Sequence, residues 1–432
     1  MPAVGATGSM SLDDIDIHTT SEYRHRGYPW EAWDRLRAEA PVYWYVRPGI
    51  EPFWAITRYR DIQWVSANDK LFVNGGGRLR LATIDEDKEM GERWAIRASE
   101  LGWDPQEPMD MVFMDRPRHT KFRSLTARRF TPRSIRGHEP DLVRYAARFA
   151  AELEQKLERD GEADLVTDFA IKLPLATICD LLGLPPDDWS KVFDFTEIVS
   201  DEELAEAHPG MNIRELRLQR TARFQQYLAT IIEGCRAAPR DDLATAVVAG
   251  EVDGCPLTPQ QLNGYLVLLL GAGNETTRNA TTRGVTALLQ HPEQMRRLVA
   301  DPSLLESAVE EILRWTSPVI QFARTATTDV ELRGQTIRAG QTVGLFYPSA
   351  NRDDAAFAEP YRFDVGREPN RHMAFGHGVH FCLGTHLARA ELRATLKALL
   401  PLLPRLELVG EPDRNGHLHV GAINHQRVQL RS

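Results

Sequence analysis

The chain has 432 residues, enough for one large domain or for two or three of average size. A hydrophobic content of 42% and a charged content of 26% are typical of a soluble globular protein. The net charge of −9 argues against general nucleic-acid binding, and the four scattered cysteines, without CxxC spacing, argue against a disulfide framework.

The beginning of the chain has no recognisable targeting segment. Residues 1–16 are small, polar and acidic, without the basic start and apolar core of a signal peptide. The longest apolar run, residues 266–270, is much shorter than a bilayer span. We therefore expect a cytoplasmic protein without a membrane anchor, with a flexible segment over residues 1–20 and a single domain over residues 21–432.

The N-terminal quarter mixes short helical and strand patterns. Hydrophobic spacing predicts a helix over residues 30–39, a strand over 52–57 and a helix over 60–67. Residues 75–111 are polar and interrupted by glycine, with a helix predicted over 85–100. This stretch is a candidate lid over a binding site.

Most of the remaining chain, from residue 117 to residue 408, has helical periodicity. The longest predicted helix has Thr258 as a good N-cap and Pro259 as a good first residue, and it continues to about Gln290. Strands are expected in three later places, over residues 323–332, 341–346 and 418–430. The sequence therefore predicts a mainly α protein with a smaller β region divided between the two ends of the chain.

A polar block interrupts the middle of the longest predicted helix. The small Ala272 and Gly273 would let a flat partner press against the helix, and Glu275 and Thr276 follow closely. The Thr276 hydroxyl can bond back to the carbonyl of Ala272 and loosen the helix, which makes room for a small ligand such as O2. The alternative is a solvated surface face, but the adjoining apolar run favours burial, where an idle carboxylate is costly.

A single cysteine, Cys382, lies in the glycine-rich stretch Phe375-Gly-His-Gly-Val-His-Phe-Cys-Leu-Gly384. Its glycines allow tight turns and let the backbone approach a flat ligand closely. A helix predicted from residue 385 to about 400 follows, and its positive end would stabilise a thiolate, which is a soft metal ligand. The alternative is a buried, unreactive cysteine.

This stretch resembles the haem-ligand loop of the cytochromes P450, because it matches the pattern Phe-x-x-Gly-x-x-x-Cys-x-Gly completely. The resemblance extends over the chain after about residue 20. It implies the P450 fold, with haem b between a large helical domain and a small β-rich domain, and Cys382 as the iron ligand. Without an N-terminal membrane helix, the chain is similar to the soluble, bacterial-type members.

The resemblance also implies roles for other residues. Glu275 and Thr276 match the acid and alcohol that deliver protons to bound dioxygen, although the commoner acid is Asp. A structural ion-pair network is matched by Glu311, Arg314 and Arg367. Contacts to the cofactor and its propionates are expected from His119, Arg123, Ala272, Arg324, Phe375, Gly376, His380 and Gly384. The substrate pocket is expected to include Leu268, Ala272, Val319, Ile320, Phe322 and Ile423.

The activity implied is insertion of one oxygen atom from O2 into a C–H bond of a hydrophobic small molecule, such as a steroid, terpenoid or branched lipid. The block at residues 271–276 lacks the third glycine of a dinucleotide fingerprint and lies inside a helix. Electrons from NAD(P)H are therefore expected through separate proteins, a ferredoxin and its reductase or a flavodoxin-type donor. A candidate docking patch comprises Arg128, Arg129, Arg133, Arg136, Arg389 and Arg393.

Three other functions remain open from the sequence. A haem peroxygenase would use hydrogen peroxide directly, but members of that type lack the acid and alcohol pair that this chain has. A haem-binding carrier or sensor without turnover is not excluded. A hydrolase with a nucleophilic cysteine is the least favoured, because the only evident bases, His377 and His380, lie in the same loop as the cysteine.

Overall fold

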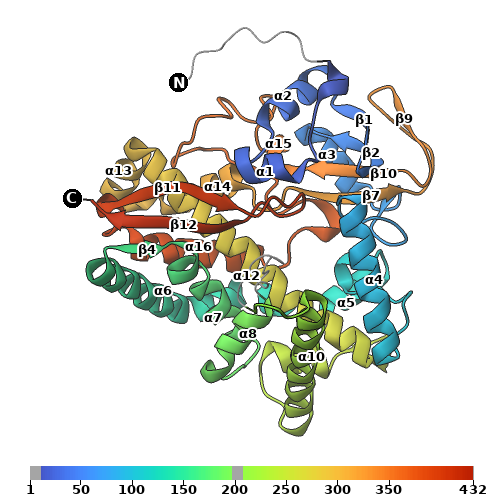
Figure 1. Cartoon of the computed structure of the whole chain (residues 1–432), viewed down its shortest axis with the longest axis horizontal. Coiled ribbons are helices and arrows are strands. Elements are labelled where there is room, and N and C mark those ends of the chain that lie inside the picture. Colours follow the sequence, from blue (N-terminus) through green and yellow to red (C-terminus); the bar gives the residue numbers. More distant parts are fainter. Residues whose placement is uncertain (1–10, 197–207, 432) are drawn as a thin grey trace.

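Helices form most of the protein, whose computed structural model describes residues 11–196 and 208–431. Helix α12 (Pro259–Gln290) is the longest of those described and runs diagonally through the middle of the molecule (Figure 1). The helices before it are α1 (Thr20–Arg26), α2 (Trp30–Glu39), α3 (Tyr59–Ala67), α4 (Ile84–Leu101), α5 (Arg118–Ala127), α6 (Pro132–Asp160), α7 (Lys172–Leu181), α8 (Trp189–Thr196), α10 (Ile213–Ala237) and α11 (Leu243–Val248). The helices after it are α13 (Pro292–Ala300), α14 (Leu305–Thr316), α15 (Tyr347–Ala350) and α16 (Thr385–Leu399).

The main sheet joins strands from both ends of the chain in the order β1-β2-β10-β7-β3. Its members are β1 (Val42–Arg47), β2 (Ile50–Ile56), β3 (Phe72–Val73), β7 (Gln321–Ala326) and β10 (Thr342–Phe346). Strands β2 and β10 run parallel, with Ala55 opposite Gly344, and the other neighbours are antiparallel. The mainly α fold with a β region divided between the two ends is therefore confirmed.

Smaller sheets complete the described β structure. The hairpin of β11 (Leu406–Arg414) and β12 (Ile423–Leu430) pairs with β4 (Glu162–Asp164) and lies across α12 in Figure 1. Two short hairpins are formed by β5 (Glu251–Val252) with β6 (Cys255–Pro256), and by β8 (Val330–Leu332) with β9 (Gln335–Ile337).

Helix α12 begins and ends where the sequence predicts. The Thr258 side chain accepts a hydrogen bond from the Gln261 N–H, and the Gln261 side chain accepts one from the Thr258 N–H. This reciprocal capping pairs two of the donors that a helix start leaves free. Pro259 occupies the first turn, and the helix ends at Gln290, immediately before His291 and Pro292.

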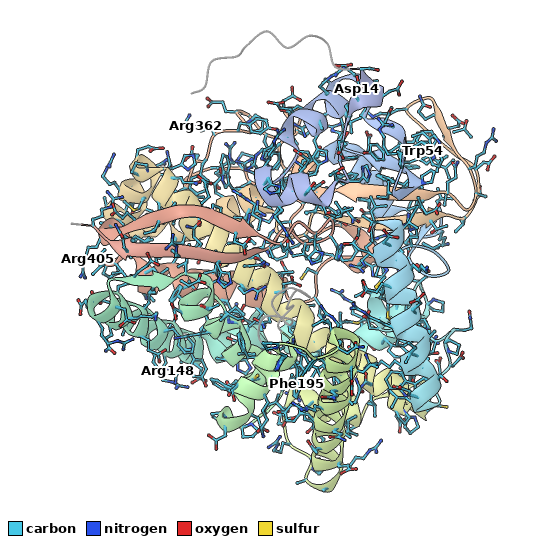
Figure 2. The ribbon with its side chains drawn as sticks, viewed as in Figure 1. Asp14, Trp54, Arg148, Phe195, Arg362 and Arg405 are labelled. Atoms are coloured by element: carbon cyan, nitrogen blue, oxygen red, sulfur yellow. The ribbon has the colours of Figure 1, made fainter. Side chains whose placement is uncertain are left out.

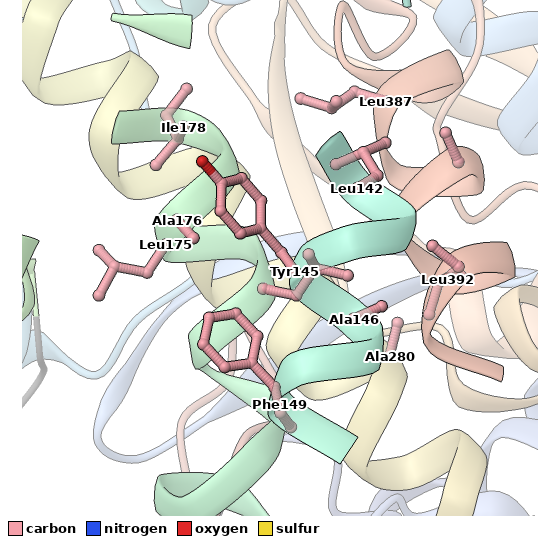
Figure 3. Packing of buried hydrophobic residues seen from close by; sticks show 14 of the residues in the cluster. Leu142, Tyr145, Ala146, Phe149, Leu175, Ala176, Ile178, Ala280, Leu387 and Leu392 are labelled. Carbon is pink, nitrogen blue, oxygen red and sulfur yellow. The ribbon is translucent and has the colours of Figure 1, made fainter. Parts of the chain in front are cut away.

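The core between α6, α7, α12 and α16 holds the helix that follows the cysteine. Figure 3 shows Leu142 and Phe149 of α6, Ile178 of α7, Ala280 of α12 and Leu392 of α16 meeting in one cluster. All five are less than 9% exposed. Burial of each large apolar side chain contributes about 1.5–3 kcal/mol relative to exposure, so this cluster fixes α16 against three other helices.

The beginning of the described chain packs against the main sheet. Ile15 and Ile17, which lie within the segment expected to be flexible, are 1% and 2% exposed. The Ile17 N–H donates to Tyr45 Oη at 3.2 Å, and Tyr23 Oη donates to the Ile17 carbonyl at 3.0 Å. Residues 1–10 of that expected segment lie outside the described residues.

Most predicted elements correspond to observed ones. The differences are in the strands, and β3, β4, β5, β6, β9 and β11 were not predicted. The single strand predicted over residues 323–332 is two strands, β7 and β8, separated by a turn. The last strand begins only at Ile423, because residues 418–422 form an irregular connection. Strand β1 was not predicted. Side chains fill the space between these elements, as Figure 2 shows around Trp54, whose Nε1 donates to Gln341 Oε1 at 2.8 Å.

Candidate active site

The loop before α16 is a tight turn that places Cys382 at a cavity also lined by α12. Gly376 and Gly378 have φ values of +69° and +75°, which L side chains rarely adopt. A Cβ atom on Gly378 would lie 2.0 Å from the carbonyl oxygen of Ser66, at the end of α3. The Cys382 N–H donates to the Phe375 carbonyl at 3.0 Å and closes the loop. Glycine is therefore required at residue 378 by both backbone angle and contact.

The Cys382 thiol lies at the N-terminal end of α16. Burial raises the pKa of the thiol, whereas the Gly384 N–H, which donates to Sγ, and the Arg123 and Arg389 charges oppose that rise. These groups and the positive end of α16 offset part of the effect of burial.

A cavity with an empty volume of about 1520 Å³, counting the solvent at its mouth, opens above Cys382. Its roof is α12, which contributes Leu268, Ala272 and Thr276. Loops at the start of α5 and β7 and the cysteine loop form the other walls. The remaining residues expected at the site that line it are His119, Arg123, Val319, Phe322, Arg324, Phe375, Gly376, His380 and Gly384.

Four basic side chains face this cavity from three parts of the chain. His119 and Arg123 come from α5, Arg324 from β7 and His380 from the cysteine loop. The two imidazole rings lie 4.2 Å apart between centroids. Burial, with a further contribution from Arg123, lowers the pKa of His119 to about 4, and burial together with Arg324 lowers that of His380.

Two buried atoms of this basic group have no hydrogen-bond partner within the described part of the chain. They are Nδ1 of His119 and Nε2 of His380. Arg324, itself 5% exposed, donates from Nη1 to the neighbouring Ala323 carbonyl at 2.7 Å, and burial lowers its pKa. Buried polar groups of this kind normally have partners. The arrangement fits a ligand with buried negative charge, as the two propionates of the predicted haem would supply, beside a soft sulfur donor.

The two residues expected to handle protons lie on different faces of α12. Thr276 lines the cavity, and its Oγ1 donates to the Ala272 carbonyl at 2.8 Å, which is the back bond that the sequence predicts. The helix is nevertheless continuous through this point. Glu275 does not line the cavity. Burial raises the pKa of its carboxyl group, with Arg278 and His417 acting in the opposite direction.

Glu311, Arg314 and Arg367 meet in a buried network below the cysteine loop. Arg314 donates to both carboxylate oxygens of Glu311 at 2.7 Å, and Arg367 Nε donates to Glu311 Oε2 at 3.1 Å. Glu311 and Arg314 are 0% exposed. Arg314 also donates to the carbonyls of Asn351 and Pro360. The network therefore fixes the segment leading to the cysteine loop, and none of its three residues lines the cavity.

Two residues expected in the substrate pocket lie elsewhere. Ile320 is fully buried in the cluster between the main sheet and the N-terminal helices, and its N–H donates to the His419 carbonyl at 2.8 Å. Ile423 lines a second, polar cavity on another side of α12. The side chain of Phe322, two residues after Ile320, faces the cavity above Cys382 instead.

The candidate lid contacts the N-terminal half of α12. Arg97 of α4 donates to Asn263 Oδ1 at 2.8 Å, and the Gln260 side chain bonds the backbone of Asp104 twice, at 3.0 and 2.9 Å. Met111, at the end of the stretch, lines the cavity. Residues 75–111 thus lie beside the cavity mouth, and their opening or closing is still a prediction.

Two acidic residues of the site region were missed from the sequence. Glu391 of α16 lines the cavity at 2% exposure, and burial raises its pKa to about 8 despite hydrogen bonds with Thr177 and Thr277. Glu310 accepts hydrogen bonds from Arg389 at 2.6 and 2.7 Å. The only signal for Glu391 was its place in an otherwise apolar helix face.

Two classes of feature are absent from the described part of the chain. Within residues 11–196 and 208–431, no three His, Cys, Asp or Glu side chains gather into a set able to hold a metal ion. Over the same residues, no helix combines the length and apolar character needed to cross a lipid bilayer.

Comparison with known proteins identifies close relatives over nearly the whole chain. The model of the Cytochrome P450 family matches residues 211–404. A methyl-branched lipid omega-hydroxylase of Mycobacterium tuberculosis is 36% identical, with 89% of this chain and 86% of that protein covered. A steroid C26-monooxygenase of Rhodococcus jostii is 33% identical, covering 93% and 82%. A structure of a Mycobacterium marinum cytochrome P450 in complex with pseudoionone superposes with a TM-score of 0.84 at 35% identity, covering 98% and 100%.

Proposed function

The chain belongs to the cytochrome P450 family of monooxygenases, and from this premise we propose that it inserts one oxygen atom from O2 into a C–H bond of a hydrophobic small molecule. The observation that carries the proposal is the arrangement around one cavity. A single thiol at a helix start lies on one side of it, a threonine on the long helix faces it, and four basic side chains line it.

The family implies a haem cofactor, and we propose haem b held by this cavity. Cys382 would be the iron ligand, and the imidazoles and guanidinium groups of His119, Arg123, Arg324 and His380 would bind the two propionates. Bound in this way, the haem supplies oxygen activation, because electron donation from a thiolate ligand favours cleavage of the O–O bond. Ala272, Phe375, Gly376 and Gly384 would contact the ring.

The chain's own residues then hold and move protons. Thr276 Oγ1 donates its hydrogen to the Ala272 carbonyl, so its lone pairs are available to accept a hydrogen bond from a group in the cavity. Glu275 would be the acid that resupplies the proton, and burial raises the pKa of its carboxyl group. Because it lies on the adjacent face of α12, this transfer requires a side-chain movement or a bridging water.

The substrate that we propose is a steroid, a terpenoid or a branched lipid. The wall residues Leu268, Val319 and Phe322 are apolar, and Met111 adds a flexible apolar side chain. Relatives named for methyl-branched lipid and steroid oxidation support this class. An apolar cavity that excludes water would also limit loss of oxidant to side reactions.

The electrons would come from NAD(P)H through a ferredoxin and its reductase, or through a flavodoxin-type donor, in the cytoplasm. Of the basic residues expected at the docking face, Arg129, Arg389 and Arg393 pair with carboxylates of the protein itself. Arg128, Arg133 and Arg136 are exposed and have no ion pair among the described residues. We propose these three as the contact for an acidic donor.

The test of the thiolate assignment is replacement of the proposed ligand. Cys382→Ala removes the only thiol that lines the cavity and is expected to abolish the thiolate-type absorption band of the reduced carbon monoxide complex. Cys179→Ala is the matched control, since Cys179 is fully buried on α7 and burial raises its thiol pKa to about 12. Survival of the band in Cys382→Ala, or its loss in the control alone, would refute the assignment.

A second measurement separates turnover from mere haem binding. With ferredoxin, its reductase and NADH, wild-type protein is expected to form an oxygenated product from a ligand that shifts the haem spectrum. NADH consumption without any substrate-dependent product would contradict a monooxygenase. Product formation with hydrogen peroxide alone, unaffected by Thr276→Ala, would favour a peroxygenase instead.

A further inference from the structure

A second cavity lies on the side of α12 away from the cysteine, and its lining is polar and basic. It has an empty volume of about 670 Å³, counting the solvent at its mouth. Arg283, Thr286 and Gln290 reach it from the last turns of α12, and Trp315 and Thr316 reach it from the end of α14. The connection between β11 and β12 and the residues after α1 close the other sides (Figure 1).

Two guanidinium groups enter this cavity, and no carboxylate does. The lining contains Arg283 and Arg414 together with His417, but neither Asp nor Glu. Neither arginine has an ion pair among residues 11–196 and 208–431. Burial lowers the pKa of Arg414 and repulsion from Arg283 lowers it further, whereas Glu411 and Asp413, which do not line the cavity, act in the opposite direction.

The contacts of Arg283 orient it without using all its donors. Its Nη1 donates to Tyr28 Oη at 2.6 Å and to the Gly421 carbonyl at 2.9 Å, and its guanidinium lies 4.2 Å from the Tyr28 ring centroid. A Cβ at residue 421 would come within 2.8 Å of the same Nη1, so glycine there permits the close approach. Nε and Nη2 of Arg283 remain available to a ligand.

Arg414 is held still more loosely. Its hydrogen bond to the protein is a 3.5 Å contact from Nη1 to the Pro412 carbonyl, which is at the limit for such a bond. The side chain lies against Gly27, where a Cβ would meet its Nε at 3.5 Å. Arg414 is therefore positioned at the cavity with nearly its full donor capacity unused.

A buried hydroxyl completes the set of donors. Thr316 lines the cavity at 1% exposure, and its Oγ1 has no hydrogen-bond partner among the residues that the structure describes. Leaving a buried hydroxyl unpaired costs about 1–3 kcal/mol, so such an atom normally marks a place for a ligand or an ordered water. Two guanidinium groups, from α12 and β11, and one hydroxyl group, from α14, thus line the same cavity.

We propose that this cavity binds a small oxyanion, a phosphate or a carboxylate, with Arg283 and Arg414 as the charged donors and Thr316 as the neutral one. Planar guanidinium groups match both oxyanions, and a bound negative charge would relieve the repulsion between the two arginines. The site is separate from the oxygenation site and does not depend on the proposed function. The protein would therefore carry a binding site for a polar ligand in addition to its hydrophobic substrate pocket.

The test is calorimetric titration of the full-length, haem-loaded protein with inorganic phosphate, at constant ionic strength maintained with chloride. Saturable binding is expected, together with a rise in the melting temperature. Arg414→Gln removes one charge-assisted contact, worth about 1.5–3 kcal/mol, and is expected to raise Kd at least about tenfold. A parallel titration with succinate distinguishes a carboxylate ligand from a phosphate.

Two further variants keep the test independent of any folding defect. Gln290→Glu is nearly isosteric, and its exposed carboxylate would compete with the ligand for the arginines, so binding should weaken about tenfold here as well. Arg427→Gln is the matched control: Arg427 lies exposed on β12, pairs with Glu162 at 3.3 Å and does not line the cavity. The proposal is overturned if neither anion binds saturably, or if Kd is the same in wild type, Arg414→Gln and Gln290→Glu.

Discussion

At the scale of single residues, Thr276 illustrates how a side chain can serve both its helix and the cavity. Its hydroxyl hydrogen is used by the Ala272 carbonyl, so toward the cavity it is an acceptor. Thr282, two turns further on, makes the same back bond to the Arg278 carbonyl at 3.0 Å but does not line the cavity. The back bond is therefore a local property of threonine in a helix, and only the position of Thr276 gives it a functional role.

We expect Thr276→Ala to uncouple electron use from product formation. Without the hydroxyl, product formed per NADH should fall about tenfold, with release of hydrogen peroxide, because general acid–base groups contribute about 100-fold or more. Product and peroxide are measured in the reconstituted system. Thr276→Ser should restore coupling, and Thr282→Ala should leave it unchanged. If wild type and Thr276→Ala formed the same amount of product per NADH, Thr276 would have no role in proton delivery.

Glu391 is a second residue whose chemistry is set by burial. It lies on α16, lines the cavity and bonds with Thr177 and Thr277, neither of which carries charge. Burial raises its pKa from 4.5 to about 8, so the carboxyl group is largely protonated at neutral pH. No step of the proposed mechanism uses this proton.

The raised pKa of Glu391 makes stability depend on pH. The folded protein binds this proton more tightly than the unfolded chain, so the stabilisation is complete below pH about 4.5 and is lost as the pH rises through about 8. Wild type should therefore lose up to about 5 kcal/mol relative to Glu391→Gln over this range. Denaturant unfolding of both proteins at pH 5, 6.5 and 8 is the measurement. A difference between them that is constant with pH would contradict the assignment.

At the scale of elements, α14 connects the cysteine loop to the helical core through two adjacent acids. Glu311 receives Arg314 and Arg367 on one side, and Glu310 receives Arg389 of α16 and His372 on the other. Burial raises the pKa of Glu310, but the bonds from Arg389 and His372 prevail and lower it to about 2. The segment around the cysteine loop is thus fixed by the ion pairs of Glu311, and the Glu310–Arg389 pair connects α14 to α16.

Glu311→Ala is expected to give a poorly folded or haem-free protein. It leaves Arg314 buried at 0% exposure without a counter-charge, and breaking such a pair costs about 3–5 kcal/mol. Glu39→Ala is the control, because the Arg35–Glu39 pair on α2 is accessible to solvent and should contribute little to stability. Haem content after purification and the unfolding midpoint are measured. A stable, fully haem-loaded Glu311→Ala protein would show that the network is dispensable.

At the scale of the whole molecule, α12 separates two cavities of opposite character. One is mainly apolar with a thiol beneath it, and the other is polar, with two arginines and an unpaired hydroxyl. The charge distribution has a third feature, the exposed Arg128 just before α6 and Arg133 and Arg136 in its first turns, on an acidic protein. A local positive patch of this kind speeds the encounter with an acidic partner most at low salt.

The double variant Arg133→Gln, Arg136→Gln tests that patch. Reduction of the haem by ferredoxin should slow about tenfold at low salt and become less sensitive to added salt, because electrostatic steering raises association rates by about 10- to 1,000-fold. Stopped-flow absorbance gives both quantities. Arg338→Gln, Arg362→Gln changes the net charge equally at exposed positions outside α6 and should keep the wild-type rate. Equal slowing in the two double variants would argue against a docking patch.

Local sequence accounts for the elements that carry the site. The limits of α12 follow from Thr258, Pro259 and the His291-Pro292 break, all within a few residues of the helix ends. The turn at Gly378 follows from a residue that tolerates positive φ. Strand β1 was not predicted, although it pairs with the adjacent β2. The end of β7 was not predicted because it depends on pairing with β3, which lies more than 200 residues earlier in the chain.

The chain by itself determined the family, the helix that carries the cysteine and the residue types around the proposed haem, because these depend on short motifs and helical periodicity. Only the tertiary structure decided which side chains share a space. Ile320 and Ile423 do not line the cavity above Cys382, and neither does Glu275, which lies on another face of α12. Glu391, which was not predicted, does line it. The physical reason is that a side chain's surroundings are set by packing between segments far apart in sequence, and no local pattern records that packing.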